Sequence, residues 1–251
     1  MSSFRSLSWW LQILSLIGLS LIPLIVIRTM TDPLGLVSQP QFVGSIFITI
    51  CLLGAIAGVR PSSFSRSVSR KSIQEEEDPQ ELEVFKEKPA LRGHHYSCDA
   101  FSDHVLRIGN NVFCAGCTGL TTGAIISIFG SLVYFFLGFT FLDELVVFWV
   151  GFSGVFLGLV QHRIYRTLSI MSGFFRFALN VIFVVGAFLV LVGANRITGD
   201  LTVDIYILCV ILLWIITRIL MSKSEHERTC KRCDDETCSH PLWALQPLTS
   251  C

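Results

Sequence analysis

A dense cluster of metal-ligand residue types lies in the stretch HHYSCDAFSDHVLRIGNNVFCAGC, residues 94–117. It contains two ligand pairs, His95-x-x-Cys98 and Cys114-x-x-Cys117, with 15 residues between them. Pairs of this form, separated by about 15–20 residues, are typical of zinc ribbons. Two intervening residues allow both members of a pair to reach one ion at a tetrahedral angle. The spacing therefore predicts a zinc site made by these four side chains.

Two further histidines leave the ligand set open. His94 is an alternative to its neighbour, and His104 lies between the two pairs, where it is either a ligand or a supporting group. The chain between the pairs reads as strand, turn, strand, with Val105-Leu-Arg-Ile108, Gly109-Asn-Asn111 and Val112-Phe113. Residues 92–117 are thus predicted to form a small zinc-ribbon-like module.

A second Cys/His cluster lies near the end of the chain. Cys230-x-x-Cys233 is followed by Cys238-Ser-His240, and Cys251 is an alternative ligand. Closely spaced cysteines also hold iron–sulfur clusters, but the histidine and the short spacing favour zinc. We therefore expect two zinc ions in total. Whether the two segments share one site stays open.

The rest of the chain has the composition of a membrane protein. Apolar residues make up 52% of the chain and charged residues 15%, against about 25% charged in soluble domains. About 20 apolar residues cross the roughly 30 Å hydrocarbon core. Six runs of about this kind predict an all-α polytopic membrane protein with six transmembrane helices: Trp9–Ile27, Phe42–Val59, Thr118–Leu142, Leu145–Val160, Phe177–Val192 and Leu201–Leu220.

Two of these runs call for a further choice. The first could be a signal peptide, but it ends in Arg28-Thr-Met-Thr-Asp32 with no small-residue cleavage site, which favours an uncleaved helix. The third and fourth runs are separated only by Asp143-Glu144, so we expect those two helices to form a hairpin. The predicted organisation is helices one and two in 1–59, a flexible charged linker in 60–91, the zinc module in 92–117, helices three to six in 118–220, and a Cys/His-rich tail in 221–251.

The charges of the loops predict the orientation in the membrane. All 19 Lys and Arg residues except Arg28 and Arg196 lie in segments on the side of the N-terminus. Because cytoplasmic loops are enriched in Lys and Arg, both termini and both Cys/His segments are expected in the cytoplasm. Thiols there stay reduced, which favours metal binding over disulfides. The net charge of zero gives no reason to expect a nucleic-acid partner.

The motif Cys114-Ala-Gly-Cys117-Thr-Gly119, directly before a predicted membrane helix, resembles the mark of a family of small archaeal and bacterial membrane proteins of unknown function. That family carries Cys-Ala-x-Cys-Thr-Gly, often with Arg as the variable residue, and an upstream Cys-His pair. In this chain Gly116 stands in place of the Arg. His94-His95 stands in place of the Cys-His pair, so the thiolate of that cysteine is missing and Cys98 would supply it. The resemblance covers roughly residues 92–140. It implies a prokaryotic plasma membrane and brings no activity.

These features favour a multi-pass plasma-membrane protein that is not an enzyme. Its zinc modules would bind a cytoplasmic protein partner or order the helix bundle, and no catalytic residue is assigned. The alternative is a membrane thiol redox or zinc-dependent enzyme that uses Cys114 and Cys117, because a helix N-terminus favours the thiolate. In a hydrolytic version, Asp99 or Asp103 would act as the base.

Transport is a less favoured function. Ionisable groups inside membrane helices usually mark an ion pathway. The polar content of the predicted helices reduces to Gln12, Asn180 and the cysteines Cys51 and Cys209, with the arginines at helix ends. That composition argues against ion-coupled transport.

Overall fold

The computed structural model describes residues 2–32, 35–59, 105–108, 111–140, 142–168 and 172–230. These ranges contain six α-helices, one π-helix and one two-stranded sheet. The helices are α1 (Ser2–Thr31), α2 (Pro40–Val59), α4 (Ala115–Ser131), the π-helix η3 (Leu132–Phe136), α5 (Glu144–Leu168), α6 (Gly173–Thr198) and α7 (Leu201–Cys230). The strands are β1 (Val105–Ile108) and β2 (Asn111–Cys114).

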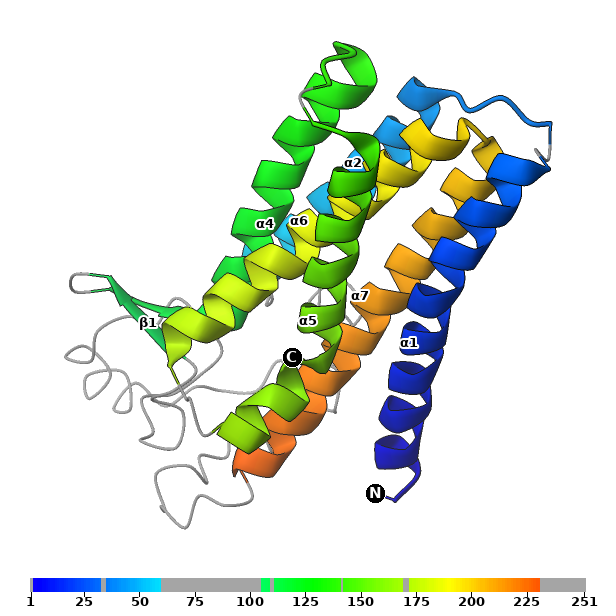
Figure 1. The fold of residues 1–251 in the computed structure, drawn as a ribbon. Coiled ribbons are helices and arrows are strands. Elements are labelled where there is room, and N and C mark those ends of the chain that lie inside the picture. Colours follow the sequence, from blue (N-terminus) through cyan, green and yellow to red (C-terminus); the bar gives the residue numbers. More distant parts are fainter. Residues whose placement is uncertain are drawn as a thin grey trace, which may run out of the picture.

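The six α-helices run alternately in opposite directions (Figure 1). The start of α1, the β1–β2 hairpin and the end of α7 lie toward one end of the bundle, here called the hairpin end. The described parts of the connections, residues 35–39, 137–140, 142–143 and 199–200, lie at the other end, here called the loop end. Alternating helix directions of this kind are expected of a chain that crosses a lipid bilayer several times.

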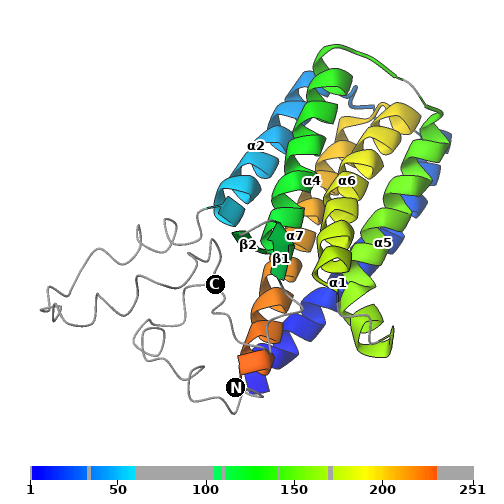
Figure 2. The same cartoon turned by 90° about the vertical axis from the view of Figure 1, so that its left-hand side faces the viewer.

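Helix α6 is the centre of the bundle. Helices α4 and α5 pack on either side of it, α2 packs on α4, and α1 packs on α7 (Figure 2). The predicted hairpin of the third and fourth helices is therefore wrong, because within the described ranges α4 and α5 are joined in sequence but separated by α6. The reason is the placement of glycine. Gly151 of α5 and Gly123 of α4 both meet the backbone of α6, and small residues allow such close helix approach.

Five helices are long and apolar enough to cross a membrane: Trp9–Thr31, Ala115–Phe136, Glu144–Gln161, Gly173–Thr198 and Leu201–Met221. The apolar part of α2, Pro40–Ile56, is shorter. Large apolar side chains also cover the outside of the bundle; Leu24, Leu53 and Phe129 are each more than half exposed. Contiguous exposed apolar surface of this kind marks a membrane or binding surface. The predicted class, an all-α membrane protein, is confirmed at this level.

Several element boundaries differ from the predictions. The third apolar run was expected to be helical from Thr118 to Leu142, but the helix begins at Ala115 and ends with η3 at Phe136. Gly138, at φ 70°, then takes a left-handed conformation that glycine adopts readily. The predicted polar tail begins as helix, because α7 continues past Leu220 to Cys230. The linker 60–91 and residues 231–251 lie outside the described residues.

Candidate metal centre at the start of α4

The predicted strand–turn–strand is present and leads directly into a helix. Strands β1 and β2 pair antiparallel, with Val105 opposite Cys114 and Leu106 opposite Phe113. Cys114 is the last residue of β2 and also the N-cap of α4, where its backbone is still extended at φ −68° and ψ 117°. The hairpin thus delivers one of the predicted ligands to the first turn of a helix.

Cys117 lies inside that helix. We expected both cysteines to precede the helix, but α4 begins at Ala115, so Cys117 is its third residue. The N-cap and the third helical residue are neighbours at the start of a helix, as the reciprocal contacts of a capping box show. Both side chains are half-buried. The pair therefore lies at the start of α4, beside backbone N–H groups that favour negative charge.

The other predicted ligands fall outside this geometry. His94, His95, Cys98 and His104 lie outside the described residues, as do Cys233, Cys238, His240 and Cys251. Cys230 is the last residue of α7. Within the ranges that the structure describes, no group of three or more His, Cys, Asp or Glu side chains is placed to hold a metal ion. Of the predicted ligands, the structure describes Cys114, Cys117 and Cys230, and the metal sites themselves stay predictions.

The first turns of α4 are fixed against α6. A Cβ atom added to Gly119 would lie 2.5 Å from the carbonyl oxygen of Phe177 and 2.9 Å from the Cβ of Asn180. A Cβ atom on Gly116 would lie 3.8 Å from the Asn180 side-chain nitrogen. Ala115 is fully buried. Gly119, which follows the Cys-x-x-Cys-Thr sequence, is thus needed for the packing of α4 on α6. The cysteine pair therefore lies at a helix start that is packed against a neighbouring helix.

Asn180 connects this helix end to α7. Its side-chain Nδ2 donates to the carbonyl oxygen of Arg176 at 2.8 Å, and its Oδ1 accepts from the guanidinium of Arg218. Arg218 also donates to the carbonyl oxygen of Gly158 at 3.3 Å, and its Cζ lies 5.5 Å from the ring centroid of Phe183. The Arg218 cluster, defined as Arg218, Asn180, Gly158 and Phe183, therefore joins α5, α6 and α7 beneath the cysteine pair.

A second polar network occupies the loop end. Asp204, in the first turn of α7, is fully buried, and Asp200, just before that helix, is 3% exposed. The expectation that the helix interiors hold almost no ionisable groups is wrong, because Asp204 lies within a predicted membrane run. A single acidic residue in the apolar stretch Leu201–Leu220 was the available signal.

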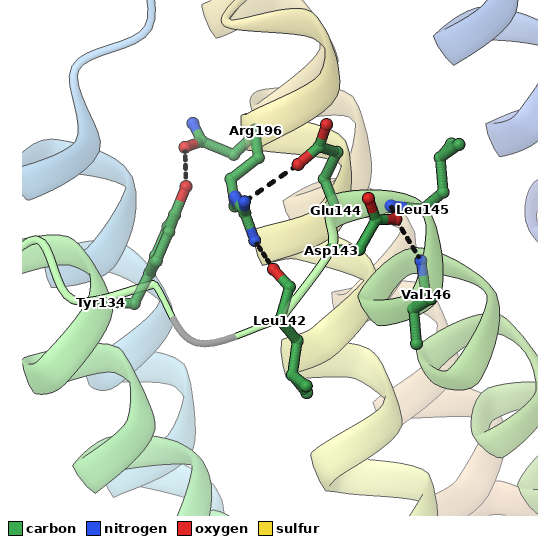
Figure 3. A network of polar contacts seen from close by, with 8 residues as sticks. Tyr134, Leu142, Asp143, Glu144, Leu145, Val146 and Arg196 are labelled. Carbon is green, nitrogen blue, oxygen red and sulfur yellow. Dashed lines mark hydrogen bonds and ion pairs between the residues drawn. The ribbon is translucent and has the colours of Figure 1, made fainter.

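An ion pair lies near the surface of the same end. Arg196 of α6 pairs with Glu144 of α5 at 2.9 Å and also donates to the carbonyl oxygen of Leu142 (Figure 3). Asp143 caps α5, since its Oδ1 accepts from the backbone nitrogens of Leu145 at 3.0 Å and Val146 at 3.2 Å. These contacts fix the start of α5 to the end of α6.

The Arg196–Glu144 pair is expected to add little stability. The two side chains are 21% and 43% exposed, and partly exposed ion pairs contribute about 0–1 kcal/mol. Glu144→Gln should therefore lower the free energy of unfolding by less than about 1 kcal/mol, measured by denaturant titration of the purified protein in detergent. A loss several times larger would show that this pair is a main contact between α5 and α6.

Comparison of the chain with protein-family models, with curated proteins and with solved structures finds no match.

Proposed function

We propose that this chain is a multi-pass membrane protein in which a zinc-stabilised hairpin module, on the cytoplasmic face, serves to bind or scaffold a protein partner. Cys114 and Cys117 would hold the zinc ion, with His95 and Cys98 as the other two ligands. The observation that supports this proposal most is the placement of the two cysteines: Cys114 ends β2, and Cys117 lies in the first turn of α4.

The size of the hairpin also supports a metal. Each strand has four residues, and an isolated two-stranded hairpin is marginally stable in water. A structural zinc site contributes on the order of 10 kcal/mol of apparent folding energy. Leu106 and Phe113 of the two strands are only half-buried. A metal ion shared between the hairpin and α4 would explain how so short a sheet keeps its place.

The proposed topology has six spans with both termini in the cytoplasm of a prokaryotic cell. The sixth span is α2, whose 20 residues rise about 30 Å at 1.5 Å per residue, and the lipid bilayer covers the exposed apolar surface. The hairpin end then faces the cytoplasm, where thiols stay reduced and available to zinc. The tail would carry the second zinc ion, on Cys230, Cys233, Cys238 and His240.

The proposal predicts the zinc content of the purified full-length protein. Wild type should carry two zinc ions per chain, and Cys114→Ser or Cys117→Ser should each remove one, because a structural site needs all four ligands. Cys230→Ser should remove the other. Cys209→Ser is the matched control, since Cys209 is exposed on the outside of α7, far from the hairpin in sequence. Zinc and protein are measured on the same sample by elemental and amino-acid analysis.

The thiol redox alternative makes the opposite prediction. The position of Cys114 and Cys117 at a helix N-terminus also suits a reactive thiol pair. A zinc-free wild type whose two cysteines cycle between reduced and disulfide forms would overturn the structural zinc site and favour an enzyme. Labelling of Cys230 by a membrane-impermeant reagent only from outside the cell would overturn the cytoplasmic orientation.

A further inference from the structure

Asp204 has one satisfied and one unsatisfied carboxylate oxygen. Its Oδ2 accepts from the Ser38 hydroxyl at 2.6 Å and from Asn195 Nδ2 at 2.8 Å. Its Oδ1 is buried and has no hydrogen-bond partner among the described residues. The whole side chain is 0% exposed. An unpartnered buried oxygen on an ionisable group needs an explanation, because natural structures contain few of them.

The charge of Asp204 is not balanced by a neighbouring cation. Within the described ranges its hydrogen-bond partners are the neutral Ser38 and Asn195. Arg196, which follows Asn195 in α6, is paired with Glu144. Asp200 is a second buried acidic residue one turn before it. The other described titratable groups around this end are Tyr134 in η3, Asp143 before α5, Tyr206 in α7, and Arg28 and Asp32 at the end of α1. A buried carboxylate in these surroundings is costly unless it is neutralised.

We propose that Asp204 is a proton-binding site of the membrane bundle, with Oδ1 as the atom that takes the proton. A hydronium ion at the loop end gives its proton to Oδ1: one O–H bond of the hydronium ion breaks, one O–H bond forms on Oδ1, and a water molecule is released. The side chain changes from −1 to 0. Oδ2 keeps its two hydrogen bonds throughout. A metal ion is the less favoured ligand, because no third His, Cys, Asp or Glu side chain joins the two acidic residues in the described part of the chain.

Polar contacts link this site to the connections of the loop end. Asn195 accepts from the Tyr134 hydroxyl at 2.7 Å through Oδ1, and its Nδ2 also donates to the Ser38 oxygen at 2.7 Å. Tyr134 belongs to the π-helix η3, and single π-helical turns are frequent at functional sites. The backbone of residues 36–38 pairs with residues 199–201, with Ser38 N to Gly199 O and Leu201 N to Leu36 O both at 2.8 Å. The proton site therefore lies next to the connection 36–38, whose backbone is hydrogen-bonded to the residues at the start of α7.

Infrared difference spectroscopy of the full-length protein in lipid nanodiscs tests the proposal. When the pH is lowered from neutral into the mildly acidic range, wild type should gain the carbonyl band of a protonated carboxyl group, and Asp204→Asn should remove that band. Asp200→Asn is the matched control, because it changes the neighbouring buried acid and an asparagine still accepts from the Thr202 backbone nitrogen, which Asp200 Oδ1 does at 2.8 Å. This control should keep the band.

A second variant covers the case in which Asp204→Asn fails to fold. Ser38→Ala removes one of the two donors to Oδ2, so the band should remain and shift to higher frequency. A band that persists in Asp204→Asn, a wild type without the band, or no shift in Ser38→Ala would each overturn the proposal. So would a rise in melting temperature caused by sodium chloride but not by choline chloride and abolished in Asp204→Asn, since that result would identify a sodium site.

Discussion

Gly151→Leu is expected to lower the free energy of unfolding by about 3 kcal/mol, the upper part of the range for overpacking substitutions. A Cβ atom at this position would lie 2.5 Å from the backbone nitrogen of Val190 and 2.8 Å from the carbonyl oxygen of Gly186. Both neighbours are backbone atoms, so no side-chain rotation relieves the contact. Helix α5 would have to move away from α6, the helix on which most of the bundle packs.

The measurement is denaturant unfolding of purified protein in one detergent, with Gly54→Leu as the matched control. Gly54 is an exposed glycine of α2, and no atom lies within 4 Å of a Cβ built there. Both variants replace a glycine by leucine in an apolar helix, but only the side chain at position 151 would clash with the backbone of α6. Equal, small effects of the two substitutions would contradict the close packing of α5 on α6.

Asn180→Leu is expected to lower the free energy of unfolding by about 2 kcal/mol, because a hydrogen bond to a charged group contributes about 1.5–3 kcal/mol. The substitution removes the oxygen that accepts from the Arg218 guanidinium and leaves the charge partly buried. It also acts on α4, since Gly119 packs against Asn180 as well as Phe177. The effect should therefore appear both in global stability and at the start of α4.

A double-mutant cycle separates the charge from the packing. Arg218→Met keeps an apolar stem and removes the guanidinium, so Asn180→Leu combined with Arg218→Met should cost less than the sum of the two single substitutions. The coupling is measured by the same denaturant titrations. Additive losses would show that Asn180 acts by packing alone and that its hydrogen bond to Arg218 adds no stability.

The parts of the fold set by local pattern were predictable from the sequence. The alternating strand residues and the Gly109-Asn-Asn turn predicted the hairpin, and long apolar runs predicted the helices because each must satisfy its backbone internally in lipid. The order of packing was not predictable in this way. Helices α4 and α5 follow each other but both contact α6, and this depends on which faces carry Gly123, Gly151 and Gly186.

The candidate sites divide in the same manner. Sequence spacing identified Cys114 and Cys117, and the structure places them on one helix start, whereas their predicted partners lie outside the described residues. The Asp204 network was missed because its members come from positions far apart in the chain. Ser38, Tyr134, Asn195 and Asp204 meet only after four segments have packed together. No local pattern carries that information.

Hydrogen exchange of the purified full-length protein, with zinc bound and after chelation, tests most directly whether a metal ion holds the hairpin on α4. Amide exchange reports local opening free energies. Chelation is predicted to speed exchange in β1, β2 and the first turn of α4 by at least about tenfold, which corresponds to 1.4 kcal/mol. The amides of α6 around Gly186 should remain protected. Unchanged exchange in the hairpin after complete removal of zinc would contradict the proposed metal centre.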